Sequence, residues 1–343
     1  FFKSAAGGIT ASDNFAPVLY TGNGSIRSIT GVGFEPDLVW IKKRSSASTG
    51  DHMLFDSVRG VDKVIISNST QAEYNGGGSG YQTSFDSDGF SITSNAFVNQ
   101  SSATYVAWNW KAGGAASSNT DGTITSQVSA NTDAGFSIVS WTGLGNNGQT
   151  VGHGLGAAPE LIITKVLNIA GEGWYTYSAE TGNTKFLTLN TTAEAKTAQQ
   201  AGYSAGSNWW NDTSPTSSVF SLGNIAEIKS YNHIAYCFHS VDGYSKIGSY
   251  NGGSTGSGNV ISTGFKPRYV ILKTTSSGED WHCFDSVRGG GDTFVNDLRP
   301  NTSEVESTFS PRQINFVNDG FYWTNAENGV NGSGKTYIYL AIA

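Results

Sequence analysis

Short apolar runs, separated by polar segments rich in Gly, Asn, Asp and Ser, follow one another along most of the chain. In residues 105–110, 233–238 and 337–342, every second position is apolar or aromatic, whereas the positions between them are mixed. A period of two with one apolar face is typical of a strand packed on one side. Residues 36–42 are apolar on both faces, which predicts a central strand. Strands at such short intervals predict an all-β fold built from β-sandwiches.

The central-strand segment occurs three times. The sequence PDLVWIK at residues 36–42 returns as PELIITK at 159–165 and as PRYVILK at 267–273. In each copy an apolar strand and a glycine turn come before it. A repeat this long has the size of a domain, because solenoid repeats are only about 20–50 residues long. We therefore predict three tandem β-sandwich modules of about 100 residues, with at most short helical turns.

A polar triplet that begins with asparagine also recurs in each copy. It lies at residues 68–70, 190–192 and 301–303, and a glutamate follows shortly afterwards each time. A Ser or Thr followed by Glu is a signature of a helix start. We therefore expect one short helical turn per module at these triplets.

Changes in composition place the module boundaries. We expect an N-terminal extension at 1–15, module 1 at 16–113, a linker rich in Ser, Thr and Gly at 114–133, module 2 at 134–240, and module 3 at 241–343. The linker is almost all small or polar, although Ile124 and Val128 within it are able to form an edge strand. The chain opens with Phe1 and its one methionine is Met53, so we interpret it as a fragment of a longer protein.

Composition and charge exclude several function classes. Glycine supplies 44 of 343 residues and charged residues only 14%, as in β-proteins of extracellular or virion surfaces. The net charge is −7 and the basic residues are not clustered, so the chain lacks the basic face on which nucleic-acid binding depends. It has no apolar stretch long enough to predict a membrane span. Cys237 and Cys283 lie in different modules, and we expect both to be buried free thiols rather than a disulfide.

The sequence FDSVRG occurs at residues 55–60 and again, unchanged, at residues 284–289. It provides the pairs Asp56–Arg59 and Asp285–Arg288, whereas module 2 has YSAETG and no arginine at this place. Such a pair is either a ligand-binding site or a bridge that holds a tight turn. We favour the structural interpretation, because charge-assisted pairs commonly fix loops.

Metal and cofactor sites are not expected. His233, Cys237 and His239 lie on the same side of one predicted strand, and the neighbours Cys237 and His239 could share one metal ion. No acidic, Cys or His residue indicates a third and a fourth ligand for that ion. Residues 86–89 (DSDG) resemble the start of a calcium loop, yet the rest of that loop is missing. A hairpin turn is the better interpretation, as at residues 319–320.

The residues also argue against an enzyme. The sequence has no Gly-x-Ser-x-Gly elbow between a strand and a helix. A glycosidase needs two carboxylates about 5–9.5 Å apart, and no Asp or Glu recurs as a pair in all three copies. Repeated catalytic domains usually repeat their catalytic residues, whereas here packing and turn residues repeat.

Two adjacent tryptophans, Trp209 and Trp210, form the candidate binding site. They lie in a polar loop with Tyr203 and Asn211. In an extended segment two neighbouring side chains cannot both point into one core, so one ring could stack on a sugar of a glycan. The alternative is that both rings pack, one in the module and one against a neighbouring module or subunit.

Several of these segments resemble a module of virion appendage proteins from bacteriophages of cyanobacteria and other marine bacteria. The sequence motifs are specific, and the resemblance covers nearly the whole chain from about residue 15 onward. It is carried by residues 20–25 (YTGNGS), 33–42 (GFEPDLVWIK), 55–60 (FDSVRG), 110–114 (WKAGG), 151–156 (VGHGLG), 210–223 (WNDTSPTSSVFSLG) and 234–238 (IAYCF). The resemblance implies a tail-fibre-like protein on the particle surface and transfers no catalytic residues.

We therefore expect a non-enzymatic structural protein of a phage particle, assembled in the host cytoplasm and exposed on the virion, that attaches to host-surface glycans. Its partners would be other virion proteins and further copies of itself, for instance in a trimer, and several copies would multiply a weak affinity. Two alternatives stay open, which are a capsid decoration protein without a receptor and a polysaccharide depolymerase.

Overall fold

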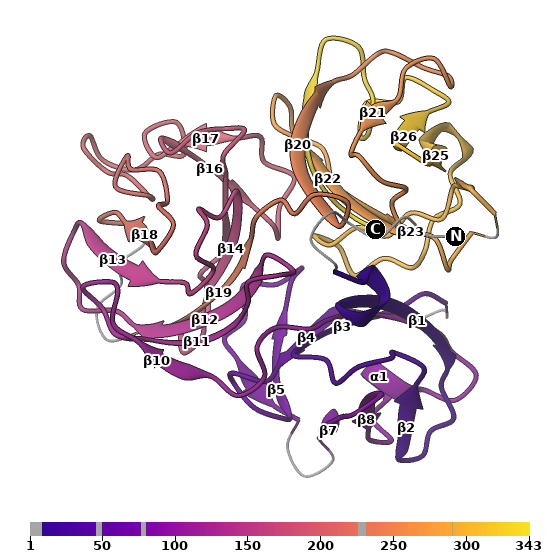
Figure 1. Cartoon of the computed structure of the whole chain (residues 1–343), viewed down its shortest axis with the longest axis horizontal. Helices are drawn as coiled ribbons and strands as arrows, with labels where there is room; N and C mark the ends of the chain where they lie inside the picture. Colours follow the sequence, from indigo (N-terminus) through magenta and orange to yellow (C-terminus); the bar gives the residue numbers. More distant parts are fainter. Residues whose placement is uncertain (1–8, 46–49, 77–79, 226–230, 290) are drawn as a thin grey trace.

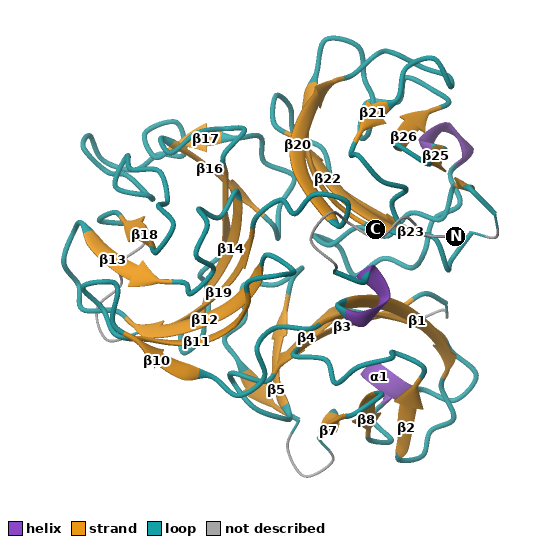
Figure 2. Ribbon diagram, viewed as in Figure 1, coloured by secondary structure: helices purple, strands orange, loops and turns teal. Residues whose placement is uncertain are grey.

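The computed structural model describes residues 9–45, 50–76, 80–225, 231–289 and 291–343. Its regular elements are almost all antiparallel β-strands, as Figure 2 shows, so the predicted all-β class is confirmed. The helical elements of the described chain are η1 (Ala11–Asp13), α1 (Ala96–Asn99) and η3 (Ser310–Arg312).

One four-stranded antiparallel order occurs three times, and we refer to the three copies as units 1, 2 and 3. Unit 1 has β1 (Phe15–Thr21), β9 (Thr104–Trp110), β3 (Leu38–Lys43) and β4 (His52–Asp56). Unit 2 has β12 (Phe136–Thr142), β19 (Asn232–Phe238), β14 (Leu161–Val166) and β15 (Trp174–Ser178). Unit 3 has β20 (Ser245–Asn251), β27 (Thr336–Ile342), β22 (Tyr269–Thr274) and β23 (Trp281–Asp285). The repeated central segments form β3, β14 and β22, which lie inside their sheets as expected.

Further strands extend two of these sheets. Unit 1 adds β5 (Lys63–Ile66) and β6 (Tyr74–Asn75), and unit 2 adds β16 (Lys185–Thr188) and β17 (Lys196–Thr197). On its other edge, unit 2 also adds β10 (Ser117–Asn119) and β11 (Ser126–Asn131). Residues 114–133 are therefore not a linker, because β11 pairs with β12, β10 pairs with β11, and Ile124 and Val128 are buried in the core of unit 2.

A small sheet covers one face of each large sheet. In unit 1 it contains β2 (Arg27–Thr30), β8 (Gly89–Ile92) and β7 (Gln82–Asp86), and in unit 2 it contains β13 (Gln149–Gly152) and β18 (Val219–Leu222). In unit 3 it contains β21 (Ile261–Ser262), β26 (Gly320–Trp323), β25 (Ile314–Val317) and β24 (Thr293–Phe294). Each unit thus has a sandwich with its own apolar core.

The opposite faces of the three large sheets meet in a fourth core that all units share (Figure 1). Along β3, Val39 and Ile41 face the core of unit 1, whereas Leu38 and Trp40 face the shared core. Alternate side chains of a strand point to opposite faces, which explains why these segments are apolar throughout. The units are therefore not independent sandwiches in a row but a ring closed around common apolar residues.

The expected hairpin turns connect β7 with β8 and β25 with β26. Gly89 has a φ of 145°, and a Cβ there would lie 2.0 Å from the Ile29 carbonyl oxygen, so the position requires glycine. Asp88 Oδ1 and Oδ2 accept hydrogen bonds from the backbone N–H groups of Gly33 and Gly31 at 2.7 and 3.1 Å. The segment that resembled a calcium loop is thus a turn.

The helical turns expected at the three asparagine triplets do not form. Instead, the side-chain Oδ1 of each asparagine accepts the backbone N–H at or next to the start of the fourth strand. Asn68 binds His52, Asn190 binds Trp174, and Asn301 binds Trp281, at 2.8 to 2.9 Å. We call Asn68, Asn190 and Asn301 the junction asparagines, because the contacts between units begin just after them.

Candidate functional site

Three equivalent junctions hold the units around the shared core. In each junction, a backbone N–H group five residues after the junction asparagine donates a hydrogen bond to the next unit. The acceptor is the carbonyl of the residue that directly follows the central strand of that unit. The pairs are Glu73 with Leu167, Ala195 with Thr275, and Glu306 with Arg44. They connect unit 1 to 2, unit 2 to 3 and unit 3 to 1. The ring is therefore closed, although the chain itself passes directly between units at only two of the three junctions.

A buried ion network reinforces the junction between units 1 and 2. Arg59 Nε lies 2.5 Å from Asp56 Oδ2, and Arg59 Nη1 lies 3.2 Å from Glu73 Oε2. Tyr236 of unit 2 donates its hydroxyl to the same Asp56 oxygen at 2.8 Å. Burial acts to lower the pKa of Arg59, but Asp56, Tyr236 and Glu73 outweigh it, so the pKa is raised. Arg59 thus stays charged and joins the turn to the junction.

The junction between units 3 and 1 repeats this network. Arg288 Nε lies 2.5 Å from Asp285 Oδ2, and Arg288 Nη1 lies 3.1 Å from Glu306 Oε1. Trp108 of unit 1 donates its indole N–H to Asp285 at 2.8 Å, and Arg44 of unit 1 pairs with Glu306 at 2.8 Å. Both Asp–Arg pairs therefore make the contacts of structural bridges, and they connect units as well as turns.

Uncharged residues occupy the same positions at the junction between units 2 and 3. Ser178 stands in place of the aspartate, Thr181 of the arginine and Ala195 of the glutamate, as strand register and junction bonds define them. Leu340 of unit 3 takes the place of the aromatic donor. Thr181 Oγ1 donates to the carbonyl of Ser178 at 3.1 Å, which remains within the turn. The charged network of the other junctions is thus replaced by smaller side chains.

A groove of about 560 Å³ opens at this junction, and we call it the seam groove. Thr181 and Ala195, two of the replaced positions, line it from unit 2. Thr275, Ser276 and Thr336 line it from unit 3. The groove therefore lies where the arginine and glutamate side chains of the other junctions are absent.

Four charged side chains stand along the seam groove, all from unit 2: Glu180, Lys185, Glu194 and Lys196. Glu180 accepts a hydrogen bond from the hydroxyl of Ser249. Within the described part of the chain, the side chains of the other three make no hydrogen bond or ion pair. Two ammonium groups and two carboxylates balance in charge and leave donors and acceptors directed to solvent.

A wider hollow of about 1290 Å³ lies where units 1 and 2 meet the start of unit 3. Several carboxylates line it, among them Asp13, Asp37 and Asp242. Asp37 is already used, because its Oδ2 accepts the backbone N–H of Ala112 at 2.7 Å. This hollow is an acidic surface around a structural carboxylate.

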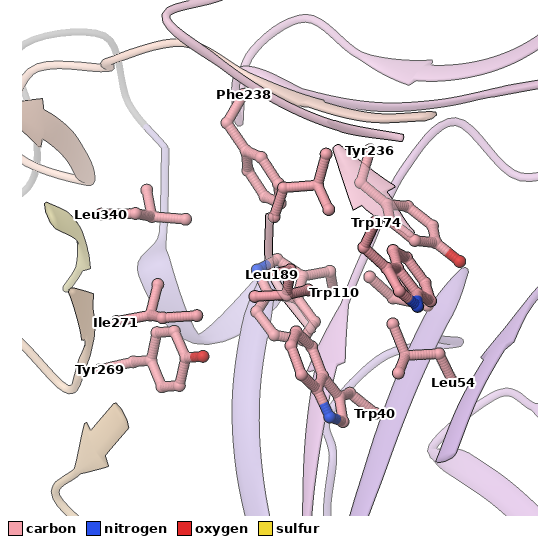
Figure 3. Close-up of a pocket in the computed structure, with 12 residues that line it drawn as sticks. Trp40, Leu54, Trp110, Trp174, Leu189, Tyr236, Phe238, Tyr269, Ile271 and Leu340 are labelled. Atoms are coloured by element: carbon pink, nitrogen blue, oxygen red, sulfur yellow. The ribbon is translucent and has the colours of Figure 1, made fainter. Parts of the chain in front are cut away.

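The centre of the ring is packed nearly solid. A cavity of about 20 Å³ lies there, which is room for about one water molecule. Figure 3 shows apolar side chains from all three units converging on it, including Trp40 and Trp110 of unit 1, Phe238 of unit 2, and Ile271 and Leu340 of unit 3. The cavity is apolar and too small for a substrate.

A buried lysine is the next-to-last residue of the central strand in each unit. The Nζ atoms donate to carbonyls: Lys42 to Gly50 and Ser303, Lys165 to Glu172, and Lys273 to Glu279 and Thr192. Burial lowers the pKa of Lys42 to about 7, and those of Lys165 and Lys273 to about 8. These lysines are equivalent in all three units and bind backbone, so we assign them to the scaffold.

Trp209 and Trp210 do not form an exposed sugar platform. Their exposed fractions are 5% and 2%, and both belong to the core of unit 2. Trp209 stacks on Tyr175 with ring centroids 3.4 Å apart, and Trp210 meets Tyr177 edge-on at 5.6 Å. Two adjacent rings reach one core because this segment forms turns rather than an extended strand. Both rings thus pack within unit 2, whereas the packing alternative had placed one of them against a neighbouring module or subunit.

The loop residues that accompany this pair lie closer to the surface. Asn211 is half-buried in a left-handed conformation with a φ of 52°. Tyr203 is 38% exposed. Neither residue forms a platform together with the buried tryptophans.

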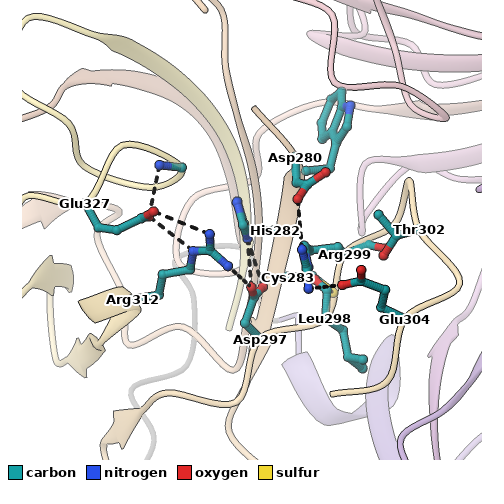
Figure 4. A network of polar contacts seen from close by, with 12 residues as sticks. Asp280, His282, Cys283, Asp297, Leu298, Arg299, Thr302, Glu304, Arg312 and Glu327 are labelled. Atoms are coloured by element: carbon teal, nitrogen blue, oxygen red, sulfur yellow. Dashed lines mark hydrogen bonds and ion pairs between the residues drawn. The ribbon is translucent and has the colours of Figure 1, made fainter. Parts of the chain in front are cut away.

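A second polar network lies in unit 3 (Figure 4). His282 Nδ1 lies 3.0 Å from both carboxylate oxygens of Asp297, and Arg312 Nη1 lies 3.1 Å from Asp297 Oδ2. Arg312 Nε in turn lies 3.1 Å from Glu327. Burial acts to raise the pKa of Asp297, but His282 and Arg312 outweigh it and hold the pKa below its ordinary value. His282 and Asp297 are both about 99% or more buried, so we assign this network to packing of the unit 3 core.

The described residues provide no other reactive centre. Cys237 and Cys283 are buried free thiols, and burial raises the pKa of Cys237 to about 12. Among these residues, no group of three or more His, Cys, Asp or Glu side chains is arranged to hold a metal ion. No helix in the described ranges is long and apolar enough to cross a membrane.

Comparison with protein-family models matches residues 10–343 to a family described as a domain of unknown function, DUF7483. The chain belongs to this family. Comparison with curated proteins gives no match, and comparison with solved structures gives no match either. The match spans all three units.

The seam groove was not predicted from the sequence, although one signal pointed toward it. The motif FDSVRG of units 1 and 3 is YSAETG in unit 2, which lacks the arginine. What the sequence did not indicate is that Thr181 would face a neighbouring unit, or that Ala195 would stand across from it in the same hollow. Both facts depend on closure of the ring.

Proposed function

We propose that this chain is a non-enzymatic structural protein of a bacteriophage particle, most specifically part of a tail fibre or similar surface appendage that attaches to host-surface glycans. The observation that carries the proposal is the use of charged residues at the junctions. Asp56, Arg59, Asp285 and Arg288 have the appearance of a repeated reactive pair, yet all four hold neighbouring units together. A closed, tightly packed ring suits a particle component that must resist mechanical and chemical stress.

Two further observations support the proposal. The sequences of the repeated segments resemble those of virion appendage modules. The composition, which is rich in uncharged polar residues, suits a protein exposed on the surface of a particle. Partners of this function would be other virion proteins and additional copies of the chain. Many copies on one particle would turn weak contacts into firm adsorption.

Location on the particle tests the proposal directly. Antibodies against the chain, carrying gold, should label the tail or its appendages in electron micrographs of purified phage. Label restricted to the capsid shell would favour a decoration protein. Particles that do not contain the chain at all would contradict any virion function.

Two solution assays separate the remaining alternatives. Soluble chain added in excess should slow adsorption of the phage to its host if it binds the receptor. Incubation with purified host polysaccharide should release no new reducing ends. Release of fragments by the chain would show that it is a depolymerase instead.

A further inference from the structure

The seam groove is a local departure from a pattern that the rest of the ring obeys. At two junctions an arginine and a glutamate bind each other where the units meet. At the third, Thr181 and Ala195 occupy these positions, and the space they leave stays open as a groove of about 560 Å³. Buried ion pairs are often replaced by apolar side chains of similar volume without loss of stability. Here the volume is not refilled, which is a sign that the opening itself is useful.

The junction stays closed without the ion network. Ala195 N–H donates to the Thr275 carbonyl at 3.0 Å, the Trp281 indole N–H donates to the Thr188 carbonyl at 3.0 Å, and Lys273 Nζ lies 3.1 Å from the Thr192 carbonyl. Ala195 and Thr275 themselves line the groove, and Trp281 belongs to the shared core. These bonds therefore hold the two walls of the groove together, as a preformed binding site requires.

The chemistry of the walls defines the kind of ligand. Lys185 and Lys196 provide donors, Glu180 and Glu194 provide acceptors, and hydroxyls of Thr181 and Ser276 provide both. A strongly anionic ligand would meet two carboxylates, and a cationic one would meet two ammonium groups. No aromatic side chain lines the groove, so an apolar ligand would find little to bury against. A neutral molecule with many hydroxyls matches these groups best.

We infer that the seam groove binds a short stretch of neutral oligosaccharide. The volume lies within the range of about 300–1,000 Å³ found for small-ligand sites, which accommodates a few sugar units. That this sugar belongs to a host-cell surface rests on the function proposed above. The groove would thus supply the glycan contact that the buried Trp209–Trp210 pair does not provide.

Filling the groove tests the inference. The triple variant Ser178→Asp, Thr181→Arg, Ala195→Glu rebuilds in unit 2 the network of the other junctions. Binding of maltotetraose to the full chain, measured by saturation-transfer NMR and calorimetric titration, should weaken by about tenfold or more, equivalent to about 1.4 kcal/mol. A galacturonate tetrasaccharide should bind more weakly than maltotetraose to the unaltered chain.

A second variant guards against a folding defect in the first. Lys185→Ala with Lys196→Ala removes exposed or half-exposed donors at the wall, and it should weaken maltotetraose binding while the unfolding temperature stays unchanged. Lys246→Ala is the matched control, because Lys246 is exposed on β20 outside the groove and should leave binding as it was.

Three results would overturn the inference. They are no detectable binding of maltotetraose by the unaltered chain, equal binding by the altered and unaltered chains, and stronger binding of the galacturonate. None of them depends on where the chain sits on a particle. If gold labels the tail but one of these three results is found, the virion function is supported and the groove is not a sugar site. If maltotetraose binds as expected but the particles do not contain the chain, the groove is a sugar site and the virion function is contradicted.

Discussion

At the scale of single residues, some positions that are equivalent in the three units make different contacts, whereas others make the same ones. The second residue of the FDSVRG turn is an aspartate that pairs with an arginine in units 1 and 3, whereas Ser178 holds this position in unit 2. The lysine near the end of the central strand, in contrast, is buried in every unit, with Nζ bound to backbone carbonyls. An amine in such a place is costly to charge, and its cost depends on pH.

The free energy of unfolding should therefore rise with pH in the alkaline range. The pKa of Lys42 is lowered from 10.5 to about 7, so between these values the unfolded chain binds more protons than the folded one. Stability then increases from about pH 7 toward pH 10.5, with a slope of up to about 1.4 kcal/mol per pH unit from this residue. Below pH 7 the full cost of the charged amine is present.

The variant Lys42→Met isolates this effect. Urea unfolding at a series of pH values should give a shallower rise for Lys42→Met than for the unaltered chain, and the control Lys246→Met should keep the original slope. The rise is not abolished, because the pKa values of Lys165 and Lys273 are also lowered, to about 8. Identical slopes for all three proteins would show that folding does not lower the pKa of Lys42.

Trp209 and Trp210 should behave as core residues. Trp209→Ala or Trp210→Ala leaves a cavity in unit 2 and should cost about 3–5 kcal/mol of unfolding free energy. Tyr203→Ala changes an exposed ring nearby and should cost far less. Denaturant titration measures both. A tryptophan variant as stable as the unaltered chain would mean that the ring is not packed as described.

At the scale of elements, the strand pattern of the sequence predicted the central strands of the large sheets but not the packing of their neighbours. The double-faced apolarity of β3, β14 and β22 is present as expected. The alternation in β9, β19 and β27 predicted packing on one side, but both faces are buried, because the regularly apolar positions face the shared core and the mixed positions face the core of their own unit. The helix-start signature failed, because an asparagine side chain satisfies a strand N–H as readily as a helical one. Local sequence cannot tell these two partners apart.

The segment that looked like a linker provides a test at this scale. Val128→Asp would put a carboxylate into the core of unit 2 and should destabilise the chain by several kcal/mol. Gln127→Asp, at the adjacent exposed position of β11, should have little effect. Thermal unfolding of the two variants separates a strand from a linker, since in a linker both changes would be harmless.

At the scale of the whole molecule, the repeat predicted three units but not their arrangement. Apolar faces on both sides of β3, β14 and β22 fit either a covered sheet within each unit or a core shared among units. The distinction lies in contacts between residues far apart in sequence, such as Trp108 with Asp285. No single copy of the repeat contains that information. The same holds for the seam groove, whose walls come from two units.

A shared core should make unfolding cooperative across the chain. Calorimetry should show one transition whose enthalpy agrees with the van't Hoff value, rather than three separate ones. Residues 241–343 produced alone should not fold stably, because Tyr269, Ile271 and Leu340 would be exposed on one face of the sheet. Independent melting of the units would contradict the closed ring.

Closure within one polypeptide also releases the ring from strict symmetry. An assembly of three identical subunits carries every substitution in triplicate, so a weakened contact in one place is weakened everywhere. Here each copy has its own stretch of sequence, and two intact ion networks retain the shape while the third position diverges. Fusion of the copies thus allows the sequence of one junction to change while the ion networks of the other two junctions continue to stabilise the ring.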